Sequence, residues 1–221
     1  MMLKQWLQVY SVTDFITIIM LLSVVSMSSV KRIETAMNTY TLNSISLAAL
    51  MGVSAFYLNA AHLYIAAVVT LLSKGVIIPY MLKKVVRPLK LTHDVEPYIN
   101  TPVSLVISSV LIVVVYSSLS KGIFIEGFTE NTLKVSVSII LISLFIMITR
   151  RKAITQVIGL LMMENGLFLA GYSLTYGMPT IIELGVLFDV LMGVIILGVF
   201  LTQIKKAFIT VDLDKLNTLK G

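Results

Sequence analysis

Seven long apolar runs divide this chain, and their lengths limit what it can fold into. Each run approaches or exceeds the roughly 17 to 25 residues that a helix needs to cross a bilayer. Because lipid offers the backbone no hydrogen bonds, such spans are expected to be helices. The sequence therefore predicts an all-α, polytopic membrane protein with seven transmembrane helices. The runs cover Val9–Val30, Thr39–Leu58, Ala61–Leu82, Thr101–Leu119, Leu133–Thr149, Ala153–Tyr176 and Thr180–Ile204.

Composition excludes a soluble fold and limits the cofactors and metals that the chain can bind. Hydrophobic residues make up 57% of the chain and charged residues 13%, which is too few to cover a surface that faces water. The chain has no cysteine, so it can hold no disulfide, no iron–sulfur cluster through thiolates and no Cys-ligated zinc. His62 and His93 are expected at opposite sides of the membrane and cannot ligate one haem. We therefore expect no cofactor and no metal in this chain, and any redox centre would lie on a partner.

The distribution of positive charge predicts the orientation. Only Asn59 and Ala60 separate the second run from the third. If these runs cross separately, most of the 17 basic residues fall in loops on one side. Such loops are typically cytoplasmic, so the N-terminus is predicted outside and the C-terminus in the cytoplasm. This also accounts for the net charge of +6 without a nucleic-acid partner. The residues are Lys31, Arg32, Lys83, Lys84, Arg87, Lys90, Arg150, Arg151, Lys152, Lys205, Lys206, Lys215 and Lys220.

Ionisable side chains inside the predicted spans are the candidates for function. Glu164 lies in the sixth run, and Glu183 and Asp189 lie in the seventh. A charged group at membrane depth costs free energy and usually marks an ion or proton path. We therefore predict a proton path through these three acids and Lys74 of the third run. Asp14, in the first run, is either a further member or an N-cap-like residue near the outer end of its helix.

Depth along the helices separates these groups. At about 1.5 Å per residue, Lys74 lies roughly 13 Å from the cytoplasmic end, Glu164 about 18 Å, Asp189 and Asp14 about 24 Å, and Glu183 about 33 Å. Such steps exceed a hydrogen bond, so water or rotating side chains are expected to carry the proton. Structural roles remain as alternatives: a paired or protonated Glu164, a Glu183 favoured by its helix dipole, and a Lys74 that snorkels to the interface.

The surroundings of Lys74 predict an irregular helix. Pro79 cannot donate a hydrogen bond to the carbonyl of Gly75, and Gly75 itself loosens a helix. We therefore predict a helix break within Ser73–Pro79. Irregular backbone at membrane depth is tolerated where it is buried in protein or lines a wet cavity, which would suit a buried lysine.

Three segments of the C-terminal third resemble one family. They are IGLLMMENG (Ile158–Gly166), ELGVLFD (Glu183–Asp189) and the tail VDLDKLNTLKG (Val211–Gly221). Together they resemble the hydrogenase-4 component E family. That family is similar to the small K-type membrane subunit of respiratory complex I and to the matching small subunit of multisubunit cation/proton antiporters. The resemblance covers about Ile154–Gly221 and extends to Lys74 and Pro79, which resemble a lysine and a proline of the family's third helix.

The resemblance implies a role in a larger assembly. It implies a non-catalytic, seven-helix subunit in the membrane arm of a group 4 nickel–iron hydrogenase or formate hydrogenlyase complex. Such subunits carry no cofactor, lie beside antiporter-like subunits and help to move protons or couple redox energy to ion movement. Compared with the complex I subunit, this chain carries Leu161 where that subunit has its acid, with Glu164 three residues later, and has Asp189 in place of a Glu.

One membrane domain, residues 1–221, is the expected organisation. Residues 9–149 would form the first five helices, residues 153–204 the two helices similar to the K-type subunit, and residues 205–221 a cytoplasmic tail. The protein would be a multi-pass protein of the cell (plasma) membrane. The tail alternates charged and apolar residues, which predicts either an amphipathic segment docked on a partner or a flexible end.

Other functions are compatible with the same residues. The chain could be a purely structural adaptor of the membrane arm, with the small residues Gly159, Gly166, Ala170 and Gly171 packing neighbouring helices. It could also be the small subunit of a multisubunit cation/proton antiporter. A stand-alone transporter or channel is the third alternative, although no inverted repeat is evident. None of these makes the chain an enzyme on its own.

Overall fold

A computed structural model describes residues 2–58, 61–86, 98–119 and 129–175, together with Gly185 and Gly193. Every regular element within these ranges is a helix. The elements are α1 (Met2–Ser29), α2 (Ile33–Leu58), α3 (Ala61–Thr70), the π-helix η1 (Leu71–Ile77), α4 (Ile78–Val86), α5 (Thr101–Leu119), α6 (Thr129–Thr149) and α7 (Ala153–Thr175).

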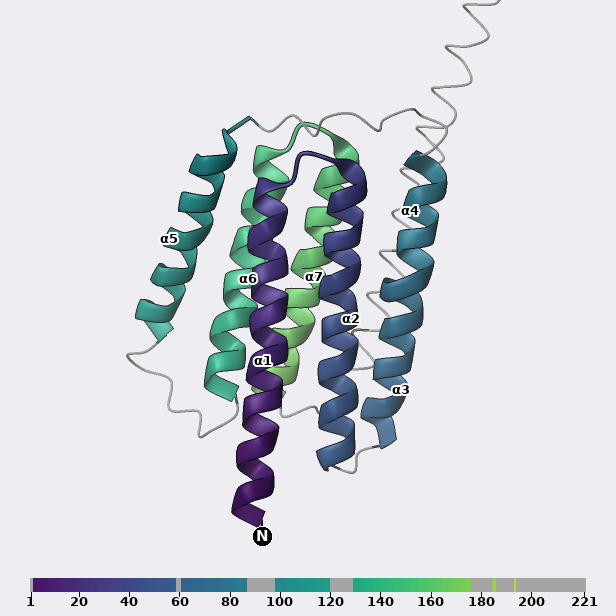
Figure 1. Cartoon of the computed structure of the whole chain (residues 1–221), viewed down its shortest axis with the longest axis vertical. Helices are drawn as coiled ribbons and strands as arrows, with labels where there is room; N and C mark the ends of the chain where they lie inside the picture. The colour runs from purple at the N-terminus through teal and green to yellow at the C-terminus, as the bar shows by residue number, and fades with distance from the viewer. Residues whose placement is uncertain are drawn as a thin grey trace, which may run out of the picture.

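The helices form a bundle in which successive columns run in opposite directions (Figure 1). Helices α3, η1 and α4 follow one another as a single column, so the described residues contain six columns. Helix α1 contacts α2, α5 and α6, while α7 contacts α6 and α2. The α5 column stands at one edge of the bundle, and the column of α3, η1 and α4 stands at the other (Figure 1).

The outer surface of the bundle is apolar, whereas its interior holds many small polar residues. Phe15, Ile148 and Val113 are exposed, while serines and asparagines such as Ser136 and Asn165 are fully buried. A protein surrounded by lipid gains nothing by hiding its apolar side chains, and its helices associate through small and polar residues instead. The pattern is therefore that of a membrane protein.

Five helical spans are long and apolar enough to cross a membrane: Val12–Ser29, Ala61–Lys84, Thr101–Leu119, Glu130–Thr149 and Ala153–Leu174. Helix α2, with 26 residues, is not among them. The seventh predicted run lies outside the described residues except for Gly185 and Gly193. The described residues are thus all-helical with five candidate membrane-spanning helices, while the count of seven and the orientation of the termini stay predictions.

The hairpin between the second and third predicted runs is present. Helix α2 ends at Leu58, α3 begins at Ala61, and the two helices pack against each other. Helices α2 and α6 begin earlier than the apolar runs, at Ile33 and Thr129, because helical hydrogen bonding can continue past the end of a hydrophobic stretch. The second and fifth predicted runs therefore belong to helices that are longer than the apolar runs themselves.

Basic residues gather at one end of the bundle. Lys31 and Arg32 lie between α1 and α2, Lys83 and Lys84 lie near the end of α4, and residues 150–152 lie between α6 and α7, all at the upper end in Figure 1. This is the shared side that the charge distribution predicts. The end of α1 at which the chain begins lies opposite (Figure 1).

Arg150 caps α1 at that basic end. Its guanidinium is buried and donates to the carbonyls of Met27 (3.2 Å), Ser28 (2.7 Å) and Val30 (3.1 Å). These carbonyls lie at the C-terminus of the helix, where positive charge is stabilising. Burial lowers the pKa of Arg150, but a guanidinium stays charged in proteins. Arg150 thus fastens the α6–α7 connection to α1.

Two glycines let α7 approach α6 closely. A Cβ at Gly159 would lie 2.9 Å from Cγ of Met147, and a Cβ at Gly166 would lie 2.8 Å from Cγ2 of Ile139. The spacing of seven residues places both glycines on nearly the same face of α7. Small residues at such positions bring helix backbones together, which is how helices associate in lipid.

We expect Gly166→Ala to lower the free energy of unfolding by about 1–3 kcal/mol, because it overfills a packed interface. The added Cβ would also lie 3.2 Å from the backbone nitrogen of Ile140, which cannot move aside as a side chain can. Gly52→Ala is the matched control, because a Cβ there meets only Cβ of Ala67, at 4.0 Å. Thermal unfolding of the purified variants in detergent measures both, and equal effects would contradict the close α6–α7 contact.

Candidate functional site

Lys74 and Glu164 form an ion pair inside the bundle. Nζ of Lys74 lies 3.4 Å from Oε1 of Glu164, and the two side chains are 1% and 7% exposed. Lys74 belongs to η1, whereas Glu164 lies at the middle of α7. The structure thus brings together two of the four residues predicted for a proton path.

The direct contact corrects the prediction that water or rotating side chains must separate these two groups. Their estimated depths differ by only about 5 Å, and depth is measured along the helix axes. A lysine side chain is long enough to cover that difference when the two helices face each other. The ammonium of Lys74 accordingly contacts Glu164 instead of extending along its own helix to the interface.

The backbone that carries Lys74 is a π-helix. The chain stays helical through Leu71–Ile77, so the break predicted in Ser73–Pro79 takes the form of a widened turn. The amide of Ile78 donates to the carbonyl of Ser73, five residues back, as a π-helix requires. Pro79 follows directly and has no amide hydrogen to donate to the preceding turn. A widened turn just before a proline lets the helix continue.

Gly75 places this turn against α2. A Cβ at Gly75 would lie 3.6 Å from Cγ1 of Ile45 and 3.3 Å from Cδ1 of Leu71. The tight fit next to Leu71 leaves little room for a side chain. A residue without a side chain thus borders Lys74, and the π-helical turn that carries the lysine is packed on its neighbours.

The chemistry open to the pair is proton exchange. Both side chains can carry a proton, and their contact allows a proton to pass from the ammonium to the carboxylate without an intervening group. A proton path needs such neighbouring ionisable groups at membrane depth, whereas an isolated buried charge has no partner for exchange.

A network of amides lies next to the pair. Nδ2 of Asn165 donates to Oδ1 of Asn43 (2.9 Å) and to Oγ of Ser44 (3.0 Å). Nδ2 of Asn43 donates in turn to Oγ of Ser23 (2.8 Å) and to the carbonyl of Met20 (3.1 Å). This network joins α7, α2 and α1, and it fixes the rotation of α7 at the residue that follows Glu164. Asparagine and serine carry no charge, so the presence of ionisable residues at membrane depth does not indicate this network.

Asp14 lies in a second polar cluster, toward the end of the bundle opposite the basic loops. Oδ1 of Asp14 accepts from Nδ2 of Asn131 (2.9 Å), and Oδ1 of Asn131 accepts from the hydroxyl of Tyr116 (3.1 Å). Lys134 pairs with Glu130 at 2.5 Å and lies 5.7 Å from the centre of the Tyr116 ring. The N-cap interpretation of Asp14 is wrong, because α1 begins at Met2.

Two predicted members of the path, Glu183 and Asp189, lie outside the described residues, as does the tail. Gly185, between them in the sequence, lies against α7, because a Cβ there would overlap the ring of Phe168. Among the residues that the structure describes, no group of three or more His, Cys, Asp or Glu is placed to hold a metal ion. The expectation that the chain binds no cofactor stays a prediction.

Comparison with known proteins gives distant relatives. No family model and no solved structure matches this chain. The uncharacterized protein Rv0085 of Mycobacterium tuberculosis is 32% identical over 164 residues, which are 73% of this chain and 74% of that protein. Hydrogenase-4 component E of Escherichia coli K12 is 22% identical over 205 residues, which are 92% of this chain and 94% of that protein, and the Shigella flexneri protein of that name matches equally. The chain therefore belongs to the family of Rv0085, and it is distantly homologous over most of its length to hydrogenase-4 component E.

Proposed function

We propose that this chain is a non-catalytic subunit of the membrane arm of a group 4 nickel–iron hydrogenase or formate hydrogenlyase complex. In that arm it takes part in proton translocation or in coupling redox energy to ion movement. Homology to hydrogenase-4 component E over 92% of the chain supports the assembly. The five apolar spans support a place within the membrane.

The buried ion pair carries the proposal for proton movement. A structural role could be filled at lower cost, because apolar residues of similar volume often stabilise a protein as well as a buried ion pair does. Ionisable groups at membrane depth are by default functional. Lys74 and Glu164 are therefore the first two members of the path, and Asp189 and Glu183 are its proposed continuation.

The proposed partners are antiporter-like membrane subunits and the other subunits of the arm. This chain carries no cofactor in the proposal, so electrons travel through the partners alone. Its own contribution is a proton path that is coupled to them. The similarity of the helices around Glu164 and Asp189 to the K-type subunit of complex I belongs to the same proposal.

The purely structural alternative assigned four small residues, among them Gly159 and Gly166, to the packing of neighbouring helices. These two glycines do pack against a neighbouring helix, α6 of this chain. Such packing is compatible with a structural adaptor as well as with a proton path, and the effect of Glu164→Gln on translocation separates the two. The antiporter alternative differs in the partner subunits, so identification of the partners decides between it and the hydrogenase assembly.

Purification from native membranes tests the assembly. We expect the tagged chain, extracted in mild detergent, to bring with it a nickel–iron hydrogenase pair, iron–sulfur proteins and large antiporter-like subunits, identified by mass spectrometry. Extraction in a harsh detergent that separates the subunits is the control for unspecific retention. Recovery with antiporter subunits but no hydrogenase would favour the antiporter alternative, and recovery of the chain alone would refute both.

A further inference from the structure

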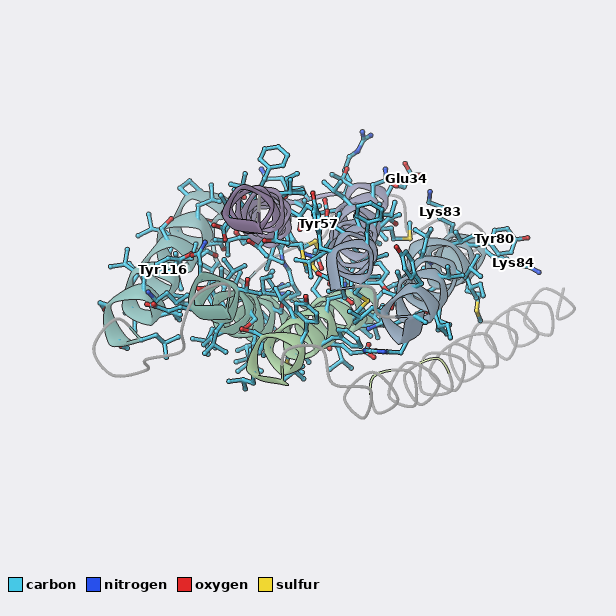
Figure 2. The ribbon with its side chains drawn as sticks, turned by 90° about the horizontal axis from the view of Figure 1, so that it is seen from below. Glu34, Tyr57, Tyr80, Lys83, Lys84 and Tyr116 are labelled. Carbon is cyan, nitrogen blue, oxygen red and sulfur yellow. The ribbon has the colours of Figure 1, made fainter. Side chains whose placement is uncertain are left out.

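The cluster around Asp14 is a second group of titratable side chains, far from the Lys74–Glu164 pair. Nine residues, or about 13 Å of helix, separate Asp14 from Ser23, which belongs to the amide network beside Glu164. Asp14 is also about 22 Å along α1 from Ser29, where the basic end of the bundle begins. Seen from below, Tyr116 lies at the α5 edge of the bundle, opposite the edge that carries Tyr80, Lys83 and Lys84 (Figure 2).

Three helices build the cluster from distant parts of the sequence. Asp14 comes from α1, Tyr116 from α5, and Glu130, Asn131 and Lys134 from the first turns of α6. The chain of bonds from the Tyr116 hydroxyl through the Asn131 amide to the Asp14 carboxylate orients the acid. A carboxylate that is held in place by a side-chain amide can take up a proton and release it without moving.

Charge in the cluster is not balanced. Lys134 already pairs with Glu130, so two carboxylates face one ammonium, and ionised Asp14 leaves one negative charge on the described cluster. Helix α2 also packs against α1, and its part after Asn43 contains one titratable side chain, that of Tyr57. Protonation of Asp14 makes the described cluster neutral, so the net charge of the cluster depends on whether Asp14 carries a proton.

The cluster lies where two apolar spans begin, because Asp14 is the third residue of the span Val12–Ser29 and Glu130 is the first of the span Glu130–Thr149. Asp14 and Asn131 are part-buried, and the side chain of Glu130 is 45% exposed, whereas the Lys74–Glu164 pair is almost fully buried. An acid that delivers protons to bulk water must reach it, and a group sealed in the core cannot do so. Asp14 has the position, the charge and the orienting bonds for that task.

We propose that Asp14, oriented by Asn131 and Tyr116, is a proton-exchange site at the end of the bundle opposite the basic loops. In the exchange, a proton leaves a donor acid of the complex and forms an O–H bond with Oδ2 of Asp14. On release this O–H bond breaks and the proton bonds to a water oxygen as hydronium, so water gains the proton that the donor has lost. A role of Asp14 in translocation rests on the proposed function. The binding and release of a proton by Asp14 does not depend on it.

The test is proton translocation by the assembled complex in sealed membrane vesicles. We expect Asp14→Asn, which can keep a hydrogen bond to Asn131, to reduce the rate about a hundredfold, because a positioned proton donor is lost. Glu34→Gln is the matched control, because Glu34 is an exposed acid in the first turn of α2, at the opposite end of the bundle, and its rate should equal that of the wild type.

The outcomes separate this site from the proposed function. Wild-type translocation by Asp14→Asn overturns the site, and if Glu164→Gln is inactive in the same assay, the proposed function survives. Wild-type translocation by both variants overturns both. Loss in Asp14→Asn with a normal Glu164→Gln supports the site and rejects the role of Glu164.

If Asp14→Asn does not assemble, a second variant tests whether Asp14 is a proton-exchange site. Tyr116→Phe removes one hydroxyl from the cluster and keeps the acid, so assembly should be normal. We expect the pH profile of translocation to shift, together with the pH at which the infrared band of the protonated carboxyl appears. An unchanged pH profile and an unchanged band would overturn the proposal.

Discussion

Glu164→Gln is expected to abolish proton translocation by the assembled complex while the complex still forms. Glutamine has the shape of glutamate and its carbonyl oxygen can lie beside the ammonium of Lys74, so the packing at the middle of α7 is kept. It cannot take up or release a proton near neutral pH. Translocation into sealed vesicles measures the loss, and mass spectrometry of the purified complex shows that every subunit is present.

Glu164→Asp is the control for this experiment. It keeps a titratable carboxyl but shortens the side chain by one methylene, so the acid lies farther from Nζ of Lys74 than the present 3.4 Å. We expect reduced but measurable translocation. If the glutamine variant pumps as well as the wild type, the ion pair is structural and the path lies elsewhere in the complex.

Much of the fold could be predicted because the bilayer imposes simple rules. The brief connection at Asn59 and Ala60 was enough to predict two separate helices, and α2 and α3 do form a hairpin there. The basic residues of separate loops do gather at one end of the bundle (Figure 1). Span length and loop charge are local properties, so a single sequence contains them.

The contacts between helices could not be predicted in the same way. Depth in the membrane is one coordinate, whereas a contact also depends on the rotation of each helix and on its neighbours. Lys74 and Glu164 therefore appeared as separate steps, although their side chains touch. Asn43 and Asn165 lie 122 positions apart and carry no charge, so nothing in the sequence pointed to their bond.

The irregular helix around Lys74 was predicted in part: its position was correct, but the predicted break is a π-helical turn. Pro79 and Gly75 did indicate a departure from regular helix. The proline removes one hydrogen-bond donor, and a helix can respond with a break, a kink or a wider turn. Packing of Gly75 against Ile45 of α2 belongs to the tertiary structure, and the wider turn at Lys74 accompanies it.

Lys74→Met is expected to destabilise the protein by about 3–5 kcal/mol, because it leaves the carboxylate of Glu164 buried without its partner. Methionine has a similar length and keeps most of the packing in η1. The acid then has two options, both unfavourable: to stay charged in the membrane interior or to take up a proton permanently. Thermal unfolding of the purified protein in detergent measures the cost.

The double variant Lys74→Met/Glu164→Leu separates stability from function. Replacing both members of a buried ion pair with apolar residues is often neutral or stabilising, so the double variant should regain most of the lost stability. It should nevertheless translocate no protons, because neither remaining side chain titrates. If the double variant is no more stable than Lys74→Met, the two residues are not energetically coupled, and the 3.4 Å contact does not govern the stability of the bundle. If it regains both stability and translocation, the pair fastens two helices and conducts nothing.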